Sequence, residues 1–442
     1  MGPNGVREAF RLGSAAHGWV QQPLWSVATV NDEVLSETTD PGYTFPYVEI
    51  SNVDHVMGIV EPMNVTFGDA PSRARRQIRE GDVLISTVRT YLRAIARVPR
   101  RWSGAIASTG FAVIRPRCID SRFLGYVLAA DAFIHEVIAR STGVSYPAIN
   151  AADVMKLKVP VPPPHEQRRI AAFLDYETSR IDELVWAQQK LLEVVAEKRT
   201  AMLSHLLIKG ANPRAALKES NLAWLGSVPN HWTQTRVGWV STFISYGFTN
   251  PMPTSPGGPY MLTANDIGYE GVRYEAARRT TDEAFHTRLT DKSKPRLGDV
   301  LITKDGTLGR VAVFDGQKAC INQSVALLRV DSGVVLPEFL ALLLSTSAYQ
   351  DRMEFDAGGT TIKHIYISRL AKMPVFLPPL SEQMKIIQKV TDELKPIGEV
   401  FDLAHKGISL LNERKSALIS SAVTGQLDLR DWEPSEVVGV LA

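Results

Sequence analysis

The sequence predicts an α+β protein in which two globular parts are each followed by a long helix, and in which the two long helices pair as an antiparallel coiled coil. Three observations predict this fold. The second half of the chain repeats the first, each copy changes from strand-like to helix-like patterning at a proline-rich joint, and each helix-like segment carries a continuous apolar stripe. With 442 residues, of which 45% are hydrophobic and 22% charged, the chain is long enough for several domains and too apolar to be disordered throughout.

The internal repeat is visible in motifs that recur at a nearly constant offset. The run Gly81 to Ile85 (GDVLI) recurs as Gly298 to Ile302, and 13 of 50 positions are identical between 159–208 and 375–424. Chance would give about three identities at typical composition. Two equivalent units on one chain predict a pseudo-twofold internal repeat.

Each copy begins with a globular part of mixed patterning. Short apolar runs separated by Gly or Pro indicate strands, and one longer segment in each copy has the apolar spacing of a helix. The predicted strands span 83–88, 93–98, 111–114, 300–303 and 325–330, and the predicted helices span 121–140 and 337–353.

Downstream of the joints at 159–164 and 374–379, apolar residues alternate at spacings of three and four. This heptad pattern is typical of a coiled coil, and each stripe needs a partner, so we expect the two stripes to bury one another. The stripe residues are Ala171, Leu174, Thr178, Ile181, Val185, Gln188, Leu192, Val195 and Met202 in the first copy, and Ile387, Val390, Leu394, Ile397, Phe401, Ala404, Ile408, Leu411 and Leu418 in the second.

A proline within the second stripe suggests where each long helix begins. Pro396 aligns with Arg180, and Ser179 with Asp182 has the pattern of an N-terminal capping box, after which proline is well tolerated. We therefore predict a short helix after each joint and a long helix of about 28 residues, or ~42 Å, starting near Arg180 and Pro396. Both long helices should end before a C-capping glycine, at Gly210 and Gly425.

These features divide the chain into five consecutive segments. They are a first α+β domain at 1–160, a first helical region at 161–210, a linker with the second α+β domain at 211–376, a second helical region at 377–425, and a C-terminal tail at 426–442.

The sequence contains no recognisable catalytic motif. It has no phosphate-binding Walker loop, and the glycine-rich run from Gly306 to Gly309 is expected to form the turn of a hairpin. Asp82 and Asp299 are expected to belong to the turns that precede two strands. The nearest approach to the Asn-Pro-Pro-aromatic loop of amino-methylating enzymes is Asn250 to Pro253 (NPMP), which lacks the second adjacent proline and the aromatic residue. We therefore expect a chain that is not an enzyme and holds no cofactor of its own.

Compartment and metal binding are constrained by simple counts. No apolar run approaches the roughly 18 residues of a membrane helix, and no secretory signal is recognisable, so the cytoplasm is the expected location. The two cysteines, Cys118 and Cys320, have no metal-ligand spacing and predict neither a disulfide framework nor a zinc site.

Basic residues gather in two stretches although the net charge is only +2. Nine arginines face two acids from Arg73 to Arg101, and nine Lys or Arg face six acids from Arg273 to Arg310. Two basic stretches favour a polyanion held at two places, with solvated surface as the alternative.

The last motifs sit at the joints, near the ends of the helical regions and before the second globular part. They are Pro162 to Ala171 (PPPHEQRRIA), Pro378 to Gln383 (PPLSEQ), Glu197 to Leu203 (EKRTAML), Glu413 to Ile419 (ERKSALI) and Trp224 to Trp232 (WLGSVPNHW). In these motifs the chain resembles the specificity subunits of type I restriction-modification enzymes over nearly its whole length. The first copy lacks a clear counterpart of the last motif, since Pro23 to Trp25 is only a remnant, and residues 1–22 are unexplained by the resemblance.

The resemblance implies a non-catalytic DNA reader with two target recognition domains that differ in sequence and so read the two halves of an asymmetric, bipartite target. It also implies two methyltransferase subunits and, in the full complex, restriction subunits as partners, with S-adenosylmethionine, ATP and Mg²⁺ on those partners. Because the helical regions and joints contact the methyltransferase in that family, Glu166, Gln167, Glu382 and Gln383 are candidates for partner binding. Helix capping or packing is the alternative role for these four residues.

For the readers themselves, we hypothesise that arginines and lysines contact phosphates or guanine edges, and that the glycine-bearing loops at 141–147 and 358–364 approach the DNA backbone. The candidates are Arg73, Arg75, Arg76, Arg79, Arg89, Arg93, Gly143 and Ser145 in the first copy, and Arg273, Arg278, Arg279, Lys304, Arg310, Gly359, Thr360 and Lys363 in the second. Two other functions stay open: a coiled-coil scaffold with no role on DNA, and a self-contained DNA-modifying enzyme.

Overall fold

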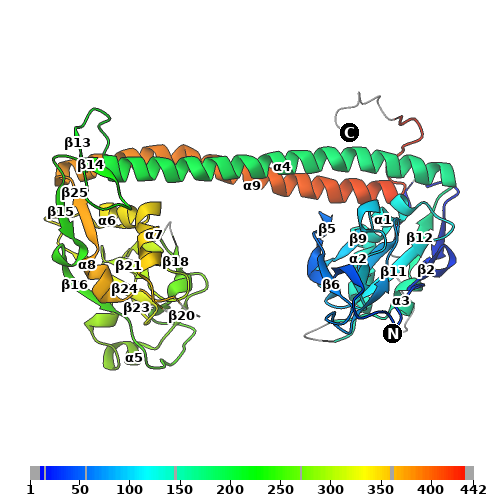
Figure 1. Cartoon of the computed structure of the whole chain (residues 1–442), viewed down its shortest axis with the longest axis horizontal. Coiled ribbons are helices and arrows are strands. Elements are labelled where there is room, and N and C mark those ends of the chain that lie inside the picture. The colour runs from blue at the N-terminus through cyan, green and yellow to red at the C-terminus, as the bar shows by residue number, and fades with distance from the viewer. Residues whose placement is uncertain are drawn as a thin grey trace. The chain divides into compact units, whose positions relative to one another are not determined.

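A computed structural model describes residues 10–13, 16–54, 57–143, 147–268, 271–358 and 363–433 (Figure 1). The chain divides into two compact units, the first formed by residues 1–188 with 405–442 and the second by residues 189–404. Each unit therefore contains one globular part, the beginning of one long helix and the end of the other.

The first unit contains two four-stranded sheets. Its strands are β1 (Val20–Pro23), β2 (Ala28–Val30), β3 (Thr44–Val48), β4 (Val53–Asp54), β5 (Gly58–Ile59), β6 (Met63–Thr66), β7 (Ala74–Gln77), β8 (Val83–Ser86), β9 (Ile95–Arg97), β10 (Ile106–Ser108), β11 (Phe111–Pro116) and β12 (Lys158–Val161), and its short helices are α1 (Ser121–Ala129), α2 (Asp131–Arg140) and α3 (Ala151–Met155). One sheet has the order β2-β11-β8-β9, the other the order β6-β3-β10-β7. Every residue of β8 is buried, which explains why its first three residues, Val83 to Ile85, are apolar.

The second unit repeats this plan. Its strands are β13 (Leu217–Glu219), β14 (Ser227–Pro229), β15 (Thr233–Arg236), β16 (Ser241–Tyr246), β17 (Tyr260–Leu262), β18 (Ile267–Gly268), β19 (Gly271–Val272), β20 (Arg278–Arg279), β21 (Val300–Thr303), β22 (Val311–Val313), β23 (Ala319–Ile321), β24 (Val325–Val330) and β25 (Pro374–Leu377), and its short helices are α5 (Asp282–Thr287), α6 (Pro337–Leu344), α7 (Ser347–Asp356) and α8 (Ile367–Lys372). The sheet order β16-β24-β21-β22 matches β2-β11-β8-β9, and the parallel pair β17–β23 matches β3–β10. The α+β class and the internal repeat are confirmed.

The predicted strands are confirmed, whereas each predicted globular helix is two helices. The segment 121–140 divides into α1 and α2 at Ala130, whose backbone is extended (φ −67°, ψ 141°). The segment 337–353 divides in the same way into α6 and α7. The apolar spacing continues across each break because both halves pack on the same core, so periodicity alone did not reveal it.

The two long helices are continuous, so the predicted breaks near Arg180 and Pro396 are wrong. Helix α4 runs from Pro164 to Lys209 over 46 residues, and α9 runs from Leu380 to Val423 over 44 residues. A helix of 46 residues is about 69 Å long instead of ~42 Å. Pro396 is exposed inside α9, and its missing N–H removes one backbone hydrogen bond from this helix.

The long helices pair antiparallel within each unit. In the first unit the beginning of α4, with Ala171 and Leu174, shares a hydrophobic core with Val423 at the end of α9. In the second unit the end of α4, with Leu207, shares a core with Val390 near the beginning of α9. Since beginning meets end in both units, the antiparallel coiled coil is confirmed.

Asp182 has a different role from the predicted helix cap. It lies inside α4, and its carboxylate oxygens accept hydrogen bonds from Nζ of Lys415 on α9 at 2.7 and 2.8 Å. Lys415 therefore ties the two helices together across the seam of the first unit.

Both long helices end at glycine, as predicted. Gly210 and Gly425 have φ values of +78° and +67°, which glycine adopts without strain. Beyond Gly425 the chain folds back on the start of α4, where Trp432 contacts Phe173 edge to face with ring centroids 5.5 Å apart. The amide of Gly13 donates to the carbonyl oxygen of Thr424 at 2.9 Å, so the described beginning and end of the chain meet in the first unit.

Replacing Pro396 by Ala is expected to raise the melting temperature. The substitution restores a backbone hydrogen bond inside α9 at an exposed position, and an interior proline costs a helix about 3 kcal/mol relative to alanine. Thermal unfolding followed by circular dichroism measures the gain. Gly398→Ala is the matched control, since a Cβ there meets no atom within 4 Å and the expected gain in stability is only about 1 kcal/mol. An unchanged melting temperature for Pro396→Ala would contradict the expectation.

No helix among the residues that the structure describes is long and apolar enough to cross a membrane.

Candidate nucleic-acid interface

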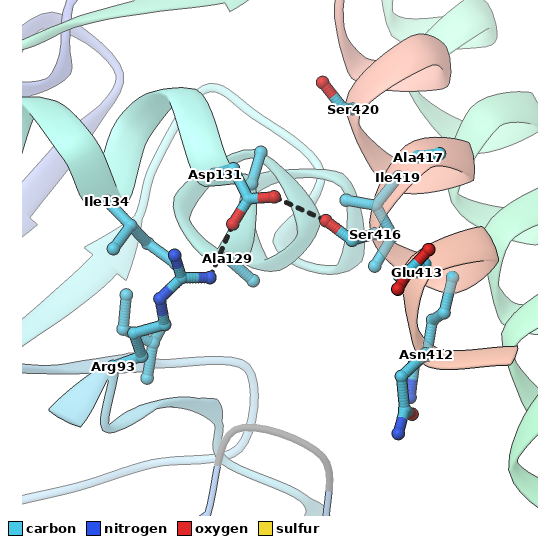
Figure 2. A pocket seen from close by; sticks show the side chains of 13 residues that line it. Arg93, Ala129, Asp131, Ile134, Asn412, Glu413, Ser416, Ala417, Ile419 and Ser420 are labelled. Carbon is cyan, nitrogen blue, oxygen red and sulfur yellow. Dashed lines mark hydrogen bonds and ion pairs between the residues drawn. The ribbon is translucent and has the colours of Figure 1, made fainter. Parts of the chain in front are cut away.

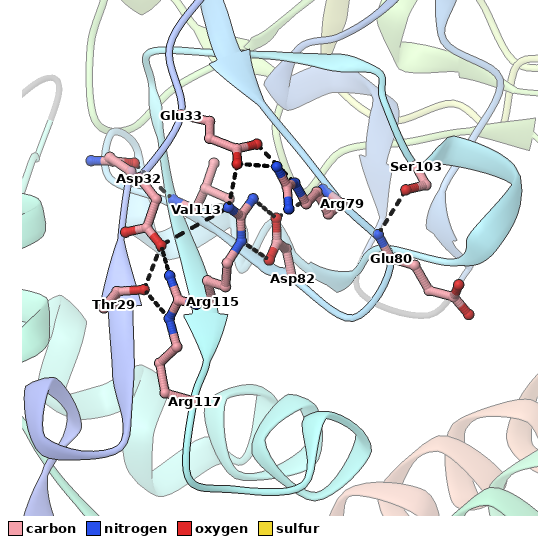
Figure 3. Close-up of polar contacts among 11 residues, drawn as sticks. Thr29, Asp32, Glu33, Arg79, Glu80, Asp82, Ser103, Val113, Arg115 and Arg117 are labelled. Atoms are coloured by element: carbon pink, nitrogen blue, oxygen red, sulfur yellow. Dashed lines mark hydrogen bonds and ion pairs between the residues drawn. The ribbon is translucent and has the colours of Figure 1, made fainter.

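A buried carboxylate at the start of β8 and another at the start of β21 fix the two turns that lead into these strands. Asp82 accepts a hydrogen bond from the amide of Arg79 and a bidentate pair from Arg115 at 2.9 and 2.8 Å (Figure 3). Asp299 makes the same contacts with the amide of Arg296 and the guanidinium of Arg329. The hydrogen bonds to Asp82 raise the pKa of Arg115 above its ordinary value. The two aspartates therefore have the predicted turn role.

Each of these strands leads into a loop that contacts one end of the glycine-bearing loop predicted in its unit. In the first unit the amide of Arg89 donates to the carbonyl oxygen of Pro147 at 2.8 Å, and Thr90 shares a hydrogen bond with Ser141. In the second unit the amide of Ile365 donates to the carbonyl oxygen of Lys304 at 2.9 Å. The described ends of the glycine-bearing loops at 141–147 and 358–364 thus occupy equivalent places in the repeat, next to the hairpins that carry the candidate cations.

Several loop residues lie outside the described part of the chain. These are Ser145, Gly359 and Thr360. Gly143 is exposed with a φ of +106°, and Lys363 is exposed and forms an ion pair with Glu354. Contact of these loops with DNA stays a prediction.

The hairpins differ in one conformational detail. Arg89 and Arg93 both adopt the left-handed backbone conformation, with φ values of 50° and 54°. The equivalent loop of the second unit has glycines with positive φ, Gly306 and Gly309. A non-glycine residue in this region carries a strain of about 1 kcal/mol, so the first unit keeps two arginines where glycine would be more stable.

Most predicted cations of the first unit have an internal partner. Nη2 of Arg73 pairs with Glu49 at 3.0 Å, Nε of Arg79 donates to Glu33 at 2.9 Å, and the guanidinium of Arg75 lies 5.0 Å from the ring centroid of Phe67. Arg76 differs, because its buried Nε has no hydrogen-bond partner and burial lowers its pKa. A buried donor without an acceptor favours an external oxygen atom there.

Arg93 connects its hairpin to the end of α9. Nη1 of Arg93 pairs with Asp131 at 2.6 Å, and the other carboxylate oxygen of Asp131 accepts from Oγ of Ser416 at 2.5 Å (Figure 2). These residues line a cavity of about 680 Å³ within the first unit. The hydrogen bond from Ser416, with support from Arg93, lowers the pKa of Asp131 below its ordinary value of 3.8.

Asp131→Asn is therefore expected to destabilise the first unit in a pH-dependent way. Because the pKa of Asp131 is lower in the folded than in the unfolded state, its stabilising charge is present above pH 3.8 and is lost as the pH falls through the folded-state pKa. We expect the variant to melt about 2 °C lower at pH 7 and to match the wild type once the pH lies below the folded-state pKa. Asp153→Asn, at an exposed carboxylate paired with Lys156, is the control. An equal difference at pH 7 and at a pH below the folded-state pKa would show that Asp131 acts through packing alone.

In the second unit, the predicted cations are divided between surface and interior. Arg273 and Arg278 are exposed, Arg310 is half-buried, and the guanidinium of Arg279 lies 3.9 Å from the ring centroid of Tyr260. Lys304 is only 5% exposed, and its Nζ pairs with Asp305 at 3.0 Å. DNA binding stays a prediction for all of these side chains, and Lys304 has the least access to a phosphate.

The four candidates for partner binding make equivalent internal contacts. Oε1 of Gln167 accepts from the amide of Asp120 at 2.7 Å, and Oε1 of Gln383 accepts from the amide of Leu336 at 2.8 Å, so each buried amide clamps the start of a globular helix onto a long helix. Glu166 and Glu382, one residue earlier, are half-buried and also accept internal hydrogen bonds. In this structure all four residues have the packing role that was the alternative, and their contact with a partner protein stays a prediction.

The hydrogen bonds to these glutamates reveal a feature that the sequence reasoning missed. Nε1 of Trp19 donates to Glu166 at 2.8 Å, and Nε1 of Trp232 donates to Glu382 at 3.3 Å. Trp19 therefore corresponds to Trp232, and the run from Leu12 to Trp19 (LGSAAHGW) is the first copy of LGSVPNHW. The view that Pro23 to Trp25 is the remnant of this motif is wrong. The offset of 213 residues, which already relates Pro46 to Pro259, would have identified it.

No group of His, Cys, Asp and Glu side chains able to hold a metal ion occurs within the described ranges. Cys118 is exposed and Cys320 is buried, and both are free thiols. Burial raises the pKa of the Cys320 thiol to about 12, which keeps it protonated.

Comparison with known proteins identifies the family. The model of the type I restriction modification DNA specificity domain matches residues 18–193 and 257–412, one match for each copy of the repeat. The chain belongs to this family. Specificity subunits are the non-catalytic DNA-recognition subunits of type I restriction-modification systems, and this specificity subunit therefore recognises DNA and is not itself an enzyme.

Individual relatives agree over most of the chain. A Methanocaldococcus jannaschii protein assigned as the type I restriction enzyme MjaX specificity subunit is 24% identical over 81% of this chain and 81% of its own length. The EcoDI specificity subunit of Escherichia coli is 22% identical over 71% of this chain and 72% of its own length. A solved chain from a study of complex assembly and conformational transition of the type I restriction-modification system superposes with a TM-score of 0.72 and 26% identity, covering 95% of this specificity subunit and 100% of that chain.

Proposed function

We propose that the specificity subunit reads an asymmetric, bipartite duplex target, with one half-site for each unit and an unread spacer between them. The observation that carries this proposal is the pair of equivalent hairpins with different chemistry. The same strand-loop-strand frame presents Arg89 and Arg93 in the first unit, and Gly306 and Gly309 with a paired Lys304 in the second. One frame with different side chains supports two different half-sites, because base readout depends on the side chains that reach the groove.

We propose further that the subunit docks two methyltransferase subunits and, in the full complex, restriction subunits that use ATP. The long helices support this role, since they carry large apolar side chains on their outer faces and such faces mark interaction sites. Those at least 42% exposed are Leu184, Trp186, Leu191 and Val194 on α4, and Met384, Leu403 and Leu410 on α9. Because the proposed substrate is genomic DNA, we place the subunit in the cytoplasm.

Methylome sequencing of the host before and after deletion of this chain tests the first proposal. We expect the loss of one gapped adenine-methylation motif, restored when the chain is supplied again. An unchanged methylome in a host that expresses the methyltransferase would contradict the bipartite-target proposal.

Trp186→Glu tests the docking role. Trp186 is 61% exposed on α4, so a charge there leaves the fold intact but removes an apolar anchor, and we expect the methyltransferase to co-purify at least tenfold less while the chain still binds duplex DNA. Trp239→Glu is the matched control, because this tryptophan is 75% exposed in the globular part of the second unit. Equal co-purification of both variants would contradict docking at this helix face.

A further inference from the structure

The second unit contains a cavity that none of the candidate DNA contacts uses. It has a volume of about 570 Å³ and lies between a first segment, which is the end of β16 with the loop after it, and a second segment, which follows α5. Tyr246 and Asn250 line it from the first segment, and Arg288 and Lys292 line it from the second. An aromatic ring, an amide and two cations thus share one cavity.

The backbone holds the first segment in a fixed position. The amide of Phe248 donates to the carbonyl oxygen of Ile321 at 3.0 Å, and the amide of Gln323 donates to the carbonyl oxygen of Phe248 at 2.8 Å. At Gly247 the chain passes so close to Ile321 that a Cβ would lie 1.8 Å from its carbonyl oxygen, so only glycine fits. The strand end with Tyr246 and the loop with Asn250 are therefore built into the sheet edge.

Most polar groups in this cavity lack internal partners, and Tyr246 has one internal contact, with Nζ of Lys304 lying 5.3 Å from the centroid of its ring. Tyr246 is 49% exposed, and within the described residues its hydroxyl group and the amide of Asn250 form no hydrogen bond. Arg288 and Lys292 are exposed and form no ion pair in the same part of the chain. Other cations nearby are paired, such as Lys318 with Asp282. An aromatic ring, an amide and two cations without a counter-ion, three complementary kinds of group, favour an external ligand.

Their combination matches the chemistry of a nucleotide. Aromatic rings stack on nucleobases, an Asn amide can both donate to and accept from a base edge, and cations bind a phosphate. We propose that this cavity binds one nucleotide unit, with the base against Tyr246, its edge toward Asn250 and the phosphate toward Arg288 and Lys292. The proposal builds on the proposed function, in which the nucleotide is one displaced from the bound duplex; a free nucleotide is the other source of the same chemistry.

The first unit lacks this chemistry at the equivalent position. Thr29 lies opposite Arg115 as Phe243 lies opposite Arg329, so by strand register Tyr246 corresponds to Asp32, and Asp32 is engaged by Arg117 and Arg115 (Figure 3). A carboxylate neither stacks on a base nor attracts a phosphate. The nucleotide site is therefore a property of the second unit alone, which distinguishes the two readers.

The first experiment measures binding of the four deoxynucleoside 5′-monophosphates to the full chain by saturation-transfer NMR, up to about 10 mM. We expect binding that Tyr246→Ala weakens about tenfold, that Tyr246→Phe retains, and that Arg288→Ala/Lys292→Ala weakens at low salt. Tyr43→Ala, at a similarly exposed tyrosine of the first unit, should bind like the wild type. Absence of mononucleotide binding, or equal binding by the wild type and Tyr246→Ala, would overturn the site.

The second experiment identifies the source of the nucleotide. Duplexes carrying the motif lost from the methylome receive 2-aminopurine at one position at a time, and displacement from the stack raises its fluorescence. A rise at one position with wild type that is absent with Tyr246→Ala supports a displaced nucleotide. Mononucleotide binding without any rise supports a free nucleotide in the same site. If the chain binds no duplex at all, the DNA-reading proposal fails, while the NMR experiment still decides the cavity.

Discussion

Asp299→Asn is expected to destabilise the second unit by about 2–4 kcal/mol and to leave the first unit intact. Asp299 is nearly fully buried and holds Arg329 in a bidentate pair, so removal of its charge leaves a cation without a counter-ion. Breaking a buried ion pair costs about 3–5 kcal/mol, and we expect less here because the Arg329 side chain is 22% exposed. The first unit has its own pair, Asp82 with Arg115, and does not depend on Asp299.

Hydrogen exchange followed by mass spectrometry resolves the two units. We expect faster exchange in β21, β22 and β24 of the Asp299→Asn variant, and unchanged exchange in β8, β9 and β11. Asp82→Asn should produce the opposite pattern. Asp291→Asn is the matched control, since its pair with Arg296 is exposed and worth less than about 1 kcal/mol. Equal loss of protection in both units of either variant would show that the two aspartates do not act locally.

The consequence for DNA binding follows from the position of the turn. Asp299 fixes the start of β21, and β21 leads directly into the loop at 304–310. A loosened β21 releases this loop and its contact with Ile365. Asp299→Asn should therefore weaken recognition of one half-site only, whereas a general loss of DNA affinity would point to unfolding of the whole chain.

The architecture was predictable from the sequence because it depends on patterns that occur in both copies of the repeat. The strand at 300–303, the stripe through Leu174 and the glycine caps are each fixed by the local period or by a residue type with one favoured conformation. The duplication also allowed one copy to be compared with the other. The antiparallel pairing follows because each stripe needed a partner.

The breaks in the helices were not predictable in the same way. Pro396 has a strong local preference against a helix interior, yet α9 continues through it, because the packing of the helix on either side, including half-buried Ile397 and Phe401, outweighs one lost hydrogen bond. Ala130 has no local preference for a break, yet the helix divides there to turn α2 along the core. In both cases tertiary packing overrides the local signal.

The candidate site was predictable as a region but not residue by residue. A run of arginines identifies a basic stretch, but only the fold shows that Arg79 is paired with Glu33, Lys304 with Asp305, and Arg93 with Asp131. The partners of Arg79 and Arg93 are distant in sequence. Lys304 and Asp305 are neighbours, but whether their side chains meet depends on the geometry of the turn. The cavity beside Tyr246 was missed because its aromatic ring and its cations come from segments about forty residues apart.

Replacing Arg89 by Gly is expected to change stability and DNA affinity in opposite directions. Arg89 has a φ of 50° and a ψ of 48°, a conformation that glycine adopts without strain and that the second unit assigns to Gly306. Relief of this strain should stabilise the first unit by up to about 1 kcal/mol. Loss of the guanidinium should lower affinity for the target duplex about tenfold and reduce the slope of log affinity against log salt by about 0.9 if the contact is to a phosphate.

Two further variants separate strain from charge at this position. Arg89→Ala keeps the strain and removes the cation, so it should lose affinity without gaining stability. Arg89→Lys keeps both strain and charge, so it should retain the salt slope, although it cannot form a bidentate contact with guanine. Thermal unfolding and fluorescence anisotropy at several salt concentrations give both readouts for each variant. If Arg89→Gly is stabilised and still binds the target with wild-type affinity and salt slope, the arginine serves no recognition role and its strained conformation has another cause.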